Sequence, residues 1–216
     1  QWLGGKPHQL EGLKLFPEDT VIAYHGDFDF AAMWPWLSGK FLKIVGELAP
    51  PQAQLEITSV LQSPIFKDVV NSLAGEAGFL VTMNEDGAKP LPIPIELGFP
   101  EVGFALVLKV KDDTIQQLLT GMLAGMPVQE KQAGKVTLKV HAVELPAPVG
   151  AFVDVTPTIF RTGDYLVLAS SEAVARRIVG AHSGTGPGLN VAPEFKTLSA
   201  GMDLTGNHIY FQSNRI

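Results

Sequence analysis

Apolar residues along the chain fall into two kinds of pattern, and the first is typical of β-strands. Residues 136–142 place Val136, Leu138 and Val140 on one face and mostly polar side chains on the other, which predicts a half-exposed antiparallel strand. Compact runs of β-branched, aliphatic and aromatic residues predict further strands. These runs span residues 20–24, 78–83, 104–110, 158–161, 165–169 and 208–212. The run at 78–83 should end at the turn signal NEDG, residues 84–87.

The second pattern repeats apolar residues every three or four positions, which predicts amphipathic helices. One such helix carries Trp34 and Leu37, contains Pro35, and can be capped by Asp27 or Asp29. Strands and helices mixed in this way favour an α+β fold with an antiparallel or mixed sheet and helices mainly on one face. The other helices are expected over residues 52–62, 65–74, 113–123 and 172–181, and from residue 193.

A proline-rich segment divides this pattern into two halves. Residues 90–100 (PLPIPIELGFP) lack several backbone donors, so we expect an extended edge or connector there and not a central strand. Residues 63–67 (SPIFK) and 192–196 (APEFK) each open a helix that a strand follows, so the two halves are either a repeat or alike by chance. We therefore divide the chain into an N-terminal α+β half at 1–88, a connector at 89–101 and a C-terminal α+β half at 102–216.

Composition limits the class of protein. The 216 residues are 46% apolar and 18% charged, which excludes a disordered chain and predicts a sizeable core. The formal net charge of −6 argues against a nucleic-acid partner, because such partners select for a basic surface. The chain has no cysteine, which excludes disulfides, thiolate nucleophiles and Cys-type zinc sites. No apolar stretch approaches the roughly 18 residues that span a bilayer, so we expect no transmembrane segment.

Three residues near the first helix form a candidate metal set. His25, Asp27 and Asp29 lie at alternate positions, and a strand running through residue 29 would place all three on one face. A histidine with two carboxylates is a plausible site for a divalent metal. A structural role is the favoured interpretation, because Gly26 interrupts the strand and one aspartate is needed as a helix cap.

Three aromatic residues of the same region form a candidate binding group. This aromatic group consists of Tyr24, Trp34 and Trp36. Exposed aromatic rings can bind a sugar ring or a groove of a partner protein, and buried ones fill a core. Burial therefore decides between the two roles.

The remaining patterns have structural explanations. Residues 183–188 (SGTGPG) are as rich in glycine as a phosphate-binding loop, but they follow a helix and lack the Gly-Lys ending, so we expect a connector. Ser170 and Ser171 stand where the next helix needs a cap, and no Gly-x-Ser-x-Gly turn is present to make a serine nucleophilic. We therefore assign no catalytic residue and no cofactor.

Three motifs are similar to a bacterial family. They are LFPEDT at residues 15–20, TGDYLVLASS at residues 162–171 and PEFK at residues 193–196. Through them the chain resembles a family of uncharacterised bacterial proteins, exported or membrane-anchored, that is known as a domain of unknown function. The resemblance implies a setting in the bacterial cell envelope or periplasm, with anchoring through a segment upstream of residue 1. It implies no reaction.

These observations favour one function over two others. We expect a non-enzymatic cell-envelope module for binding or scaffolding, with a protein or glycan as its partner. The alternative is a metal-assisted hydrolase that uses the set His25, Asp27 and Asp29. A third hypothesis is an inhibitor-like or assembly domain whose C-terminal end pairs with a strand outside this sequence. Dimerisation through the strand at residues 208–212 would support it.

Overall fold

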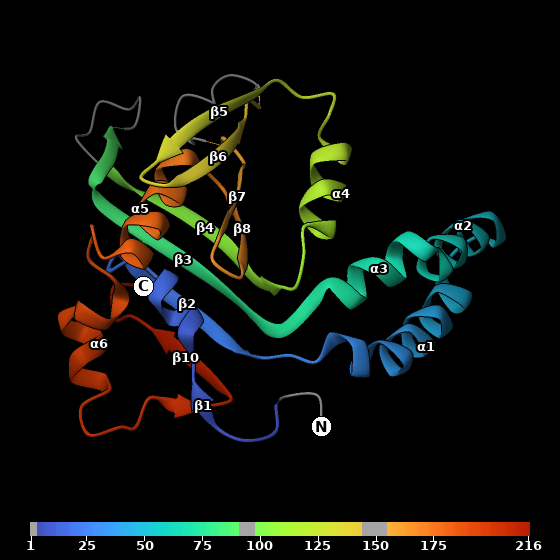
Figure 1. Ribbon diagram of the computed structural model, residues 1–216, viewed down its shortest axis with the longest axis horizontal. Helices are drawn as coiled ribbons and strands as arrows, with labels where there is room; N and C mark the ends of the chain where they lie inside the picture. The colour runs from blue at the N-terminus through green and yellow to red at the C-terminus, as the bar shows by residue number, and fades with distance from the viewer. Residues whose placement is uncertain (1–3, 91–97, 144–154) are drawn as a thin grey trace.

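A large antiparallel sheet forms the centre of the protein (Figure 1). The computed structural model describes residues 4–90, 98–143 and 155–216. Within these residues there are six α-helices, an eight-stranded sheet and a two-stranded sheet, so the expected α+β class is confirmed.

The longest strands lie in the middle of the large sheet, and the helices connect its strands. The strands of the large sheet are β2 (Thr20–Asp27), β3 (Leu73–Pro90), β4 (Gly98–Val110), β5 (Val128–Ala133), β6 (Val136–His141), β7 (Thr158–Thr162), β8 (Tyr165–Ala169) and β10 (His208–Gln212). The small sheet pairs β1 (His8–Gln9) with β9 (Thr205–Gly206). The helices are α1 (Phe30–Leu48), α2 (Pro51–Gln62), α3 (Pro64–Ser72), α4 (Thr114–Met122), α5 (Glu172–Ser183) and α6 (Pro193–Leu198), with short 3-10 helices η1 (Glu11–Leu15) and η3 (Leu189–Val191).

Strand order brings the two ends of the chain together. The order across the large sheet is β10-β2-β3-β4-β8-β7-β6-β5, and each neighbouring pair is antiparallel. Strands from residues 1–88 and from residues 102–216 therefore belong to one sheet. Of the expected connector, residues 91–97 lie outside the described residues, and the rest belongs to the paired strands β3 and β4.

One face of the sheet, here called the inner face, carries the main core. Leu80, Val107 and Phe160 are completely buried there, under α5 and the segments around η1, η3 and α6. The sheet and α5 approach closely at Gly103, where a Cβ atom would stand 2.2 Å from Cγ2 of Val174. Only glycine leaves enough room for this contact.

The opposite face, here called the outer face, is covered at one end by helices of the described chain. Ile115 of α4 and Val69 of α3 pack there against Ile159 and Leu166. Helices α1 and α2 leave the sheet after β2, and Figure 1 shows them extending away from it. Among the residues of these two helices, Val45 alone is buried.

α1 starts at one of the two predicted positions, and the strand before it is longer than predicted. β2 continues through Gly26 to Asp27, and the absence of a side chain at Gly26 admits His208 of the neighbouring strand. Asp29 is the residue that caps α1, since its side chain accepts a hydrogen bond from the backbone N–H of Ala32 at 2.9 Å. Of the two candidate caps, the second is the one used.

Two strands were predicted wrongly for identifiable reasons. β3 continues past residues 84–87, where it was expected to end. Its pairing with β4 is irregular after Asn84 and resumes at Lys89. The turn signal thus marks an irregularity within a long hairpin. β5 was missed because its sequence, VQEKQA, is polar and belongs to an edge strand that buries Ala133 alone.

Candidate functional site

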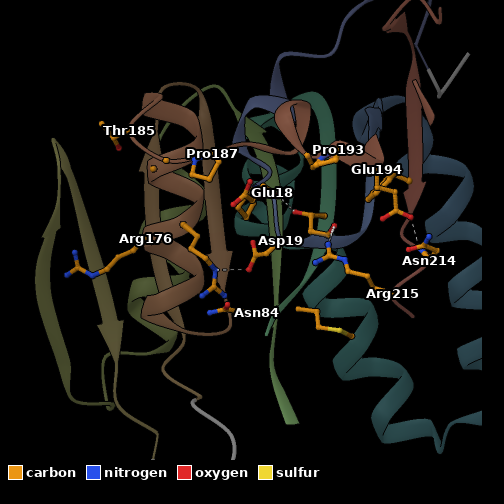
Figure 2. A pocket seen from close by; sticks show the side chains of 18 residues that line it. Glu18, Asp19, Asn84, Arg176, Thr185, Pro187, Pro193, Glu194, Asn214 and Arg215 are labelled. Carbon is orange, nitrogen blue, oxygen red and sulfur yellow. Dashed lines mark hydrogen bonds and ion pairs between the residues drawn. The ribbon is translucent and has the colours of Figure 1, made fainter. Parts of the chain in front are cut away.

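A cavity with both polar and apolar lining residues lies where β2 begins and β10 ends, beside α5 and α6 (Figure 2). Its volume is about 840 Å³, within the range of about 300–1,000 Å³ that is usual for small-molecule sites. Figure 2 shows side chains reaching it from both helices, from the chain that enters β2 and from the chain that leaves β10. The cavity therefore depends on segments from both ends of the sequence.

Helix α5 positions one wall of the cavity. Its first turn is capped by Ser171, whose hydroxyl accepts a hydrogen bond from the backbone N–H of Val174. It ends at Gly184, which has the left-handed backbone conformation (φ +71°) that glycine adopts without strain. The chain then turns back through residues 185–187, which line the cavity. The glycine-rich segment expected as a connector therefore also builds the site.

Arg177 of α5 joins three polar groups at the base of this wall. Its Nε lies 3.1 Å from Oδ2 of Asp19, and its Nη1 lies 3.5 Å from Oε2 of Glu101. Its Nη2 donates a weak hydrogen bond to the hydroxyl of Thr82, at 3.4 Å. The guanidinium thus ties α5 to the start of β2 and to the β3–β4 hairpin.

The Asp19 carboxylate has an unusual environment. It is mostly buried, and its contact with Arg177 is close enough for an ion pair but is not aligned as a hydrogen bond. Neither carboxylate oxygen has a hydrogen-bond donor within the described residues. Burial raises the pKa of Asp19, and the charge of Arg177 offsets only part of that effect. Both oxygens are also shielded from solvent, so the side chain must turn toward the cavity before it can accept a hydrogen bond from a molecule there.

The other side of the cavity is more fully paired. Arg215 donates from Nε to the hydroxyl of Ser213 at 3.1 Å and from Nη2 to the carbonyl of Thr20 at 3.2 Å. Glu194 accepts from Ser213 and from the backbone N–H of Asn214. These hydrogen bonds lower the pKa of Glu194, so this carboxylate is charged and engaged at neutral pH.

Charges of the two signs balance around the cavity. Among its lining residues, three arginines face three acids. They are Arg176, Arg177 and Arg215, and Glu18, Asp19 and Glu194. A balanced lining of guanidinium, carboxylate and amide groups can hold a ligand by hydrogen bonds without demanding a net charge from it.

A second group of charged residues is buried on the inner face near the far end of β2. Glu76 accepts hydrogen bonds from Nε2 of His25 at 3.2 Å, from the hydroxyl of Tyr165 at 2.9 Å and from Lys109. Burial by itself raises the pKa of Glu76, but these three donors outweigh it and lower the pKa to about 2. Burial also raises the pKa of Tyr165, as does its bond to Glu76. The group ties four strands of the sheet together.

The structure does not gather the candidate metal set around one point. His25 bonds to Glu76, whereas Asp27 accepts hydrogen bonds from His8 at 2.8 Å and from Asn207 at 2.9 Å. Asp29 is engaged as the cap of α1. Among residues 4–90, 98–143 and 155–216, no three His, Asp or Glu side chains are arranged to hold a metal ion.

The aromatic group is divided between the sheet and the first helix. Tyr24 lies on the outer face and stacks on Phe79, with 6.0 Å between the ring centroids. Trp34 packs against Phe66 of α3, with 4.5 Å between the ring centroids, and Trp36 is half exposed. None of the three aromatic residues lines the cavity.

Sequence reasoning did not find the cavity, although two of the motifs contribute to it. Pro17 and Asp19 come from LFPEDT, and Pro193 and Glu194 come from PEFK. The two motifs are separated by most of the chain. The pairing of β10 with β2 brings them together, as do backbone hydrogen bonds from Glu18 to Pro187 and from Leu189 to Phe16. The available signal was the presence of charged residues inside motifs that otherwise consist of turn and core residues.

No family model, curated protein or solved structure matches the chain. In the part of the chain that the structure describes, no helix combines the length and apolar character needed to cross a membrane.

Proposed function

We propose that the protein is a non-enzymatic binding module of the bacterial cell envelope and that its cavity holds a glycan without net charge. The supporting observation is Asp19, a buried carboxylate on the cavity with no hydrogen-bond donor in the described residues. Buried polar groups in proteins are nearly always paired. The hydroxyl groups of a sugar are donors that would satisfy this carboxylate once its shielded oxygens turned toward the cavity.

The charge of the ligand follows from the charges around the cavity. Each of the three arginines already contacts a carboxylate, a hydroxyl or a backbone carbonyl of the protein. A phosphate or a carboxylate on the ligand would compete with these partners and would meet three acids in the same lining. A neutral polyhydroxylated molecule meets neither obstacle.

A binding role is favoured over hydrolysis by the state of the carboxylates. Glycosidases use two carboxyl groups that flank the bond to be cut, one as acid and one as base or nucleophile. Glu194 is engaged by Ser213 and Asn214, and Asp19 is paired with Arg177. The envelope setting is supported by the resemblance of the three motifs alone.

Isothermal titration calorimetry with neutral oligosaccharides tests the proposal, using oligomers of glucose and of N-acetylglucosamine as separate probes. We expect saturable binding of at least one series with a Kd at or below about 1 mM. The variant Asp19→Asn keeps the size of the side chain and removes the buried charge, so it should remain folded. It should weaken binding about 5- to 10-fold, the effect of losing hydrogen bonds to a charged acceptor.

The exposed α4 residue Gln117 provides the matched control, and Gln117→Ala should bind as the parent protein does. Mass spectrometry of the glycan after long incubation should show it intact. Two results would overturn the proposal: no binding of any neutral series at about 10 mM, or an affinity that Asp19→Asn leaves unchanged. A cleaved glycan would overturn its non-enzymatic part.

A further inference from the structure

Part of the outer face of the sheet is apolar and open to solvent. Tyr210, Tyr24, Phe79 and Leu106 stand opposite one another across β10, β2, β3 and β4. Phe104, on the next row, is 64% exposed. We call the most exposed apolar residues of this surface the sheet patch, and they are Phe79, Val102, Phe104, Leu106 and Tyr210.

The patch also lacks charge. The strand segments 20–26, 77–83, 102–108 and 208–212 contain no Asp, Glu, Lys or Arg. Antiparallel sheets with one face in water alternate apolar and polar residues. β2, β3 and β4 are instead mostly apolar on both faces, whereas β10 alternates and places His208, Tyr210 and Gln212 on the outer face. Composition of this kind is typical of a sheet that is covered on both sides, yet no helix of the described residues covers the sheet patch.

Helix α1 also has an apolar stripe that is exposed to solvent. Phe41, Ile44 and Leu48 follow one another at helical spacing, so they lie on one side of the helix. All three are exposed, Leu48 to 81%. Val45, the buried residue of α1, is four positions from Phe41 and therefore borders this stripe. We call Phe41, Ile44 and Leu48 the arm stripe, and helices α1 to α3 the arm.

We propose that the sheet patch of one chain is covered by the arm stripe of a second copy, and that the contact is reciprocal. Each chain carries one exposed sheet patch and one exposed arm stripe. A two-fold dimer covers both sheet patches and both arm stripes in two equivalent contacts. The proposal goes beyond the glycan site, which lies on another part of the molecule.

The available area agrees with a dimer. A covered aromatic side chain removes about 150–250 Å² from water, so at the observed exposure the three rings of the sheet patch still present roughly 300 Å². With the aliphatic members and the arm stripe, each chain offers apolar area on the order of 800 Å², which is what each partner buries in an interface of standard size. The sheet patch by itself is comparable to the largest apolar patch of a typical monomer, about 300–600 Å², which is often a functional surface.

Charge favours a second copy over a lipid surface. The arm carries three basic and three acidic residues, so it is neutral while the whole chain has a net charge of −6. A neutral arm approaches an acidic partner without added repulsion. A helix that lies on a membrane usually presents a basic polar face, which the arm lacks. The charged residues of the arm are Lys40, Lys43, Lys67, Glu47, Glu56 and Asp68.

Size-exclusion chromatography with light scattering at about 50 µM tests the contact through charge substitutions on each surface. The unmodified protein should have the mass of two chains. Phe104→Lys on the sheet patch and Ile44→Lys on the arm stripe should each give the mass of one chain, because either places an unpaired charge in the interface. Both positions are more than half exposed, so the variants should keep the circular dichroism spectrum of the parent. Ser59→Lys, on an exposed polar position of α2, is the control and should remain dimeric.

Cysteine cross-linking tests which surfaces meet, and the absence of native cysteine makes it specific. A mixture of Phe104→Cys and Ile44→Cys proteins should form a mixed disulfide dimer under mild oxidation. Predominant cross-linking of Phe104→Cys to itself would show that two sheets meet and would overturn the reciprocal arrangement. A monomeric parent, or an intramolecular disulfide in the double variant, would overturn the dimer itself.

Discussion

The two faces of the large sheet have the same kind of composition and different surroundings. The inner face packs under α5 and the segments around η1 and η3, and Leu80 and Phe160 are completely buried there. The outer face is covered by α3 and α4 at one end and leaves Phe79, Phe104 and Leu106 in contact with solvent. The difference indicates that the first face is completed by the fold and the second by an interaction. Substitutions on the two faces should therefore have different effects.

The largest effect is expected from truncation of the inner core. Phe160→Ala should lower the free energy of unfolding by about 3–5 kcal/mol, the usual cost of removing a buried phenylalanine. The measurement is urea denaturation followed by circular dichroism, at a concentration low enough to keep the protein monomeric. A loss below about 1 kcal/mol would show that this face is not the main core.

The next effect concerns the charged group on the same face. Glu76→Gln should cost about 2–4 kcal/mol, because it leaves the buried His25 and the partly exposed Lys109 without their carboxylate. The pKa of Glu76 is lowered to about 2, so its charged form stabilises the fold above pH 4.5. That contribution should be lost as the pH falls from 4.5 toward 2, and the loss should be absent in the variant. Denaturation of the parent protein and of Glu76→Gln across this pH range measures the difference. The same change in the free energy of unfolding with pH in both proteins would contradict the prediction.

A smaller effect is expected where the sheet touches α5. Gly103→Ala should cost about 1–3 kcal/mol, because the new methyl group overlaps Val174. Val174→Ala in the same chain removes the overlapping atom, so the double variant should lose less than the two single losses added together. A full double-mutant cycle by urea denaturation measures this coupling. Strict additivity would mean that α5 does not lie against Gly103.

The smallest effect on a single chain is expected on the outer face. Phe104→Thr replaces an exposed ring by a residue that suits strands, so at low concentration the free energy of unfolding should change by less than about 0.5 kcal/mol. At high concentration the parent protein alone should gain stability, because dimerisation favours the folded state. Thermal unfolding of the parent and of Phe104→Thr at several protein concentrations measures both effects. A large loss at low concentration would place Phe104 in the core and remove the contrast between the faces.

Much of the secondary structure could be predicted from local patterns. The hairpin of β7 and β8, the helix α5 with its cap at Ser171, and β10 follow the periodicity and turn chemistry of the sequence. The ends of β2 and β3 could not be predicted in this way. Gly26 and the turn signal after Met83 are local breakers, but β2 stays paired through Gly26, and β3 pairs with β4 again from Lys89. Tertiary hydrogen bonds outweighed local preference at these points.

The candidate site depends on contacts that a single sequence does not reveal. Asp19 and Arg177 are 158 positions apart, and their contact requires α5 to lie beside the segment that leads into β2. The aromatic residues near α1 were prominent in the sequence, but the cavity is built from charged residues that resemble ordinary turn and helix residues. Likewise, His25 and Asp27 share a face of β2 as alternation predicts, while their partners come from β3, β1 and the chain before β10.

The most direct test of the difference between the two faces is sedimentation equilibrium of the unmodified protein between about 1 and 100 µM. If a second copy covers the outer face, the mass should rise with concentration from 23.2 kDa toward twice that value, and Phe104→Lys should hold it at 23.2 kDa. A mass of 23.2 kDa at every concentration would contradict the account, because the outer face would then remain uncovered by any second copy of the chain.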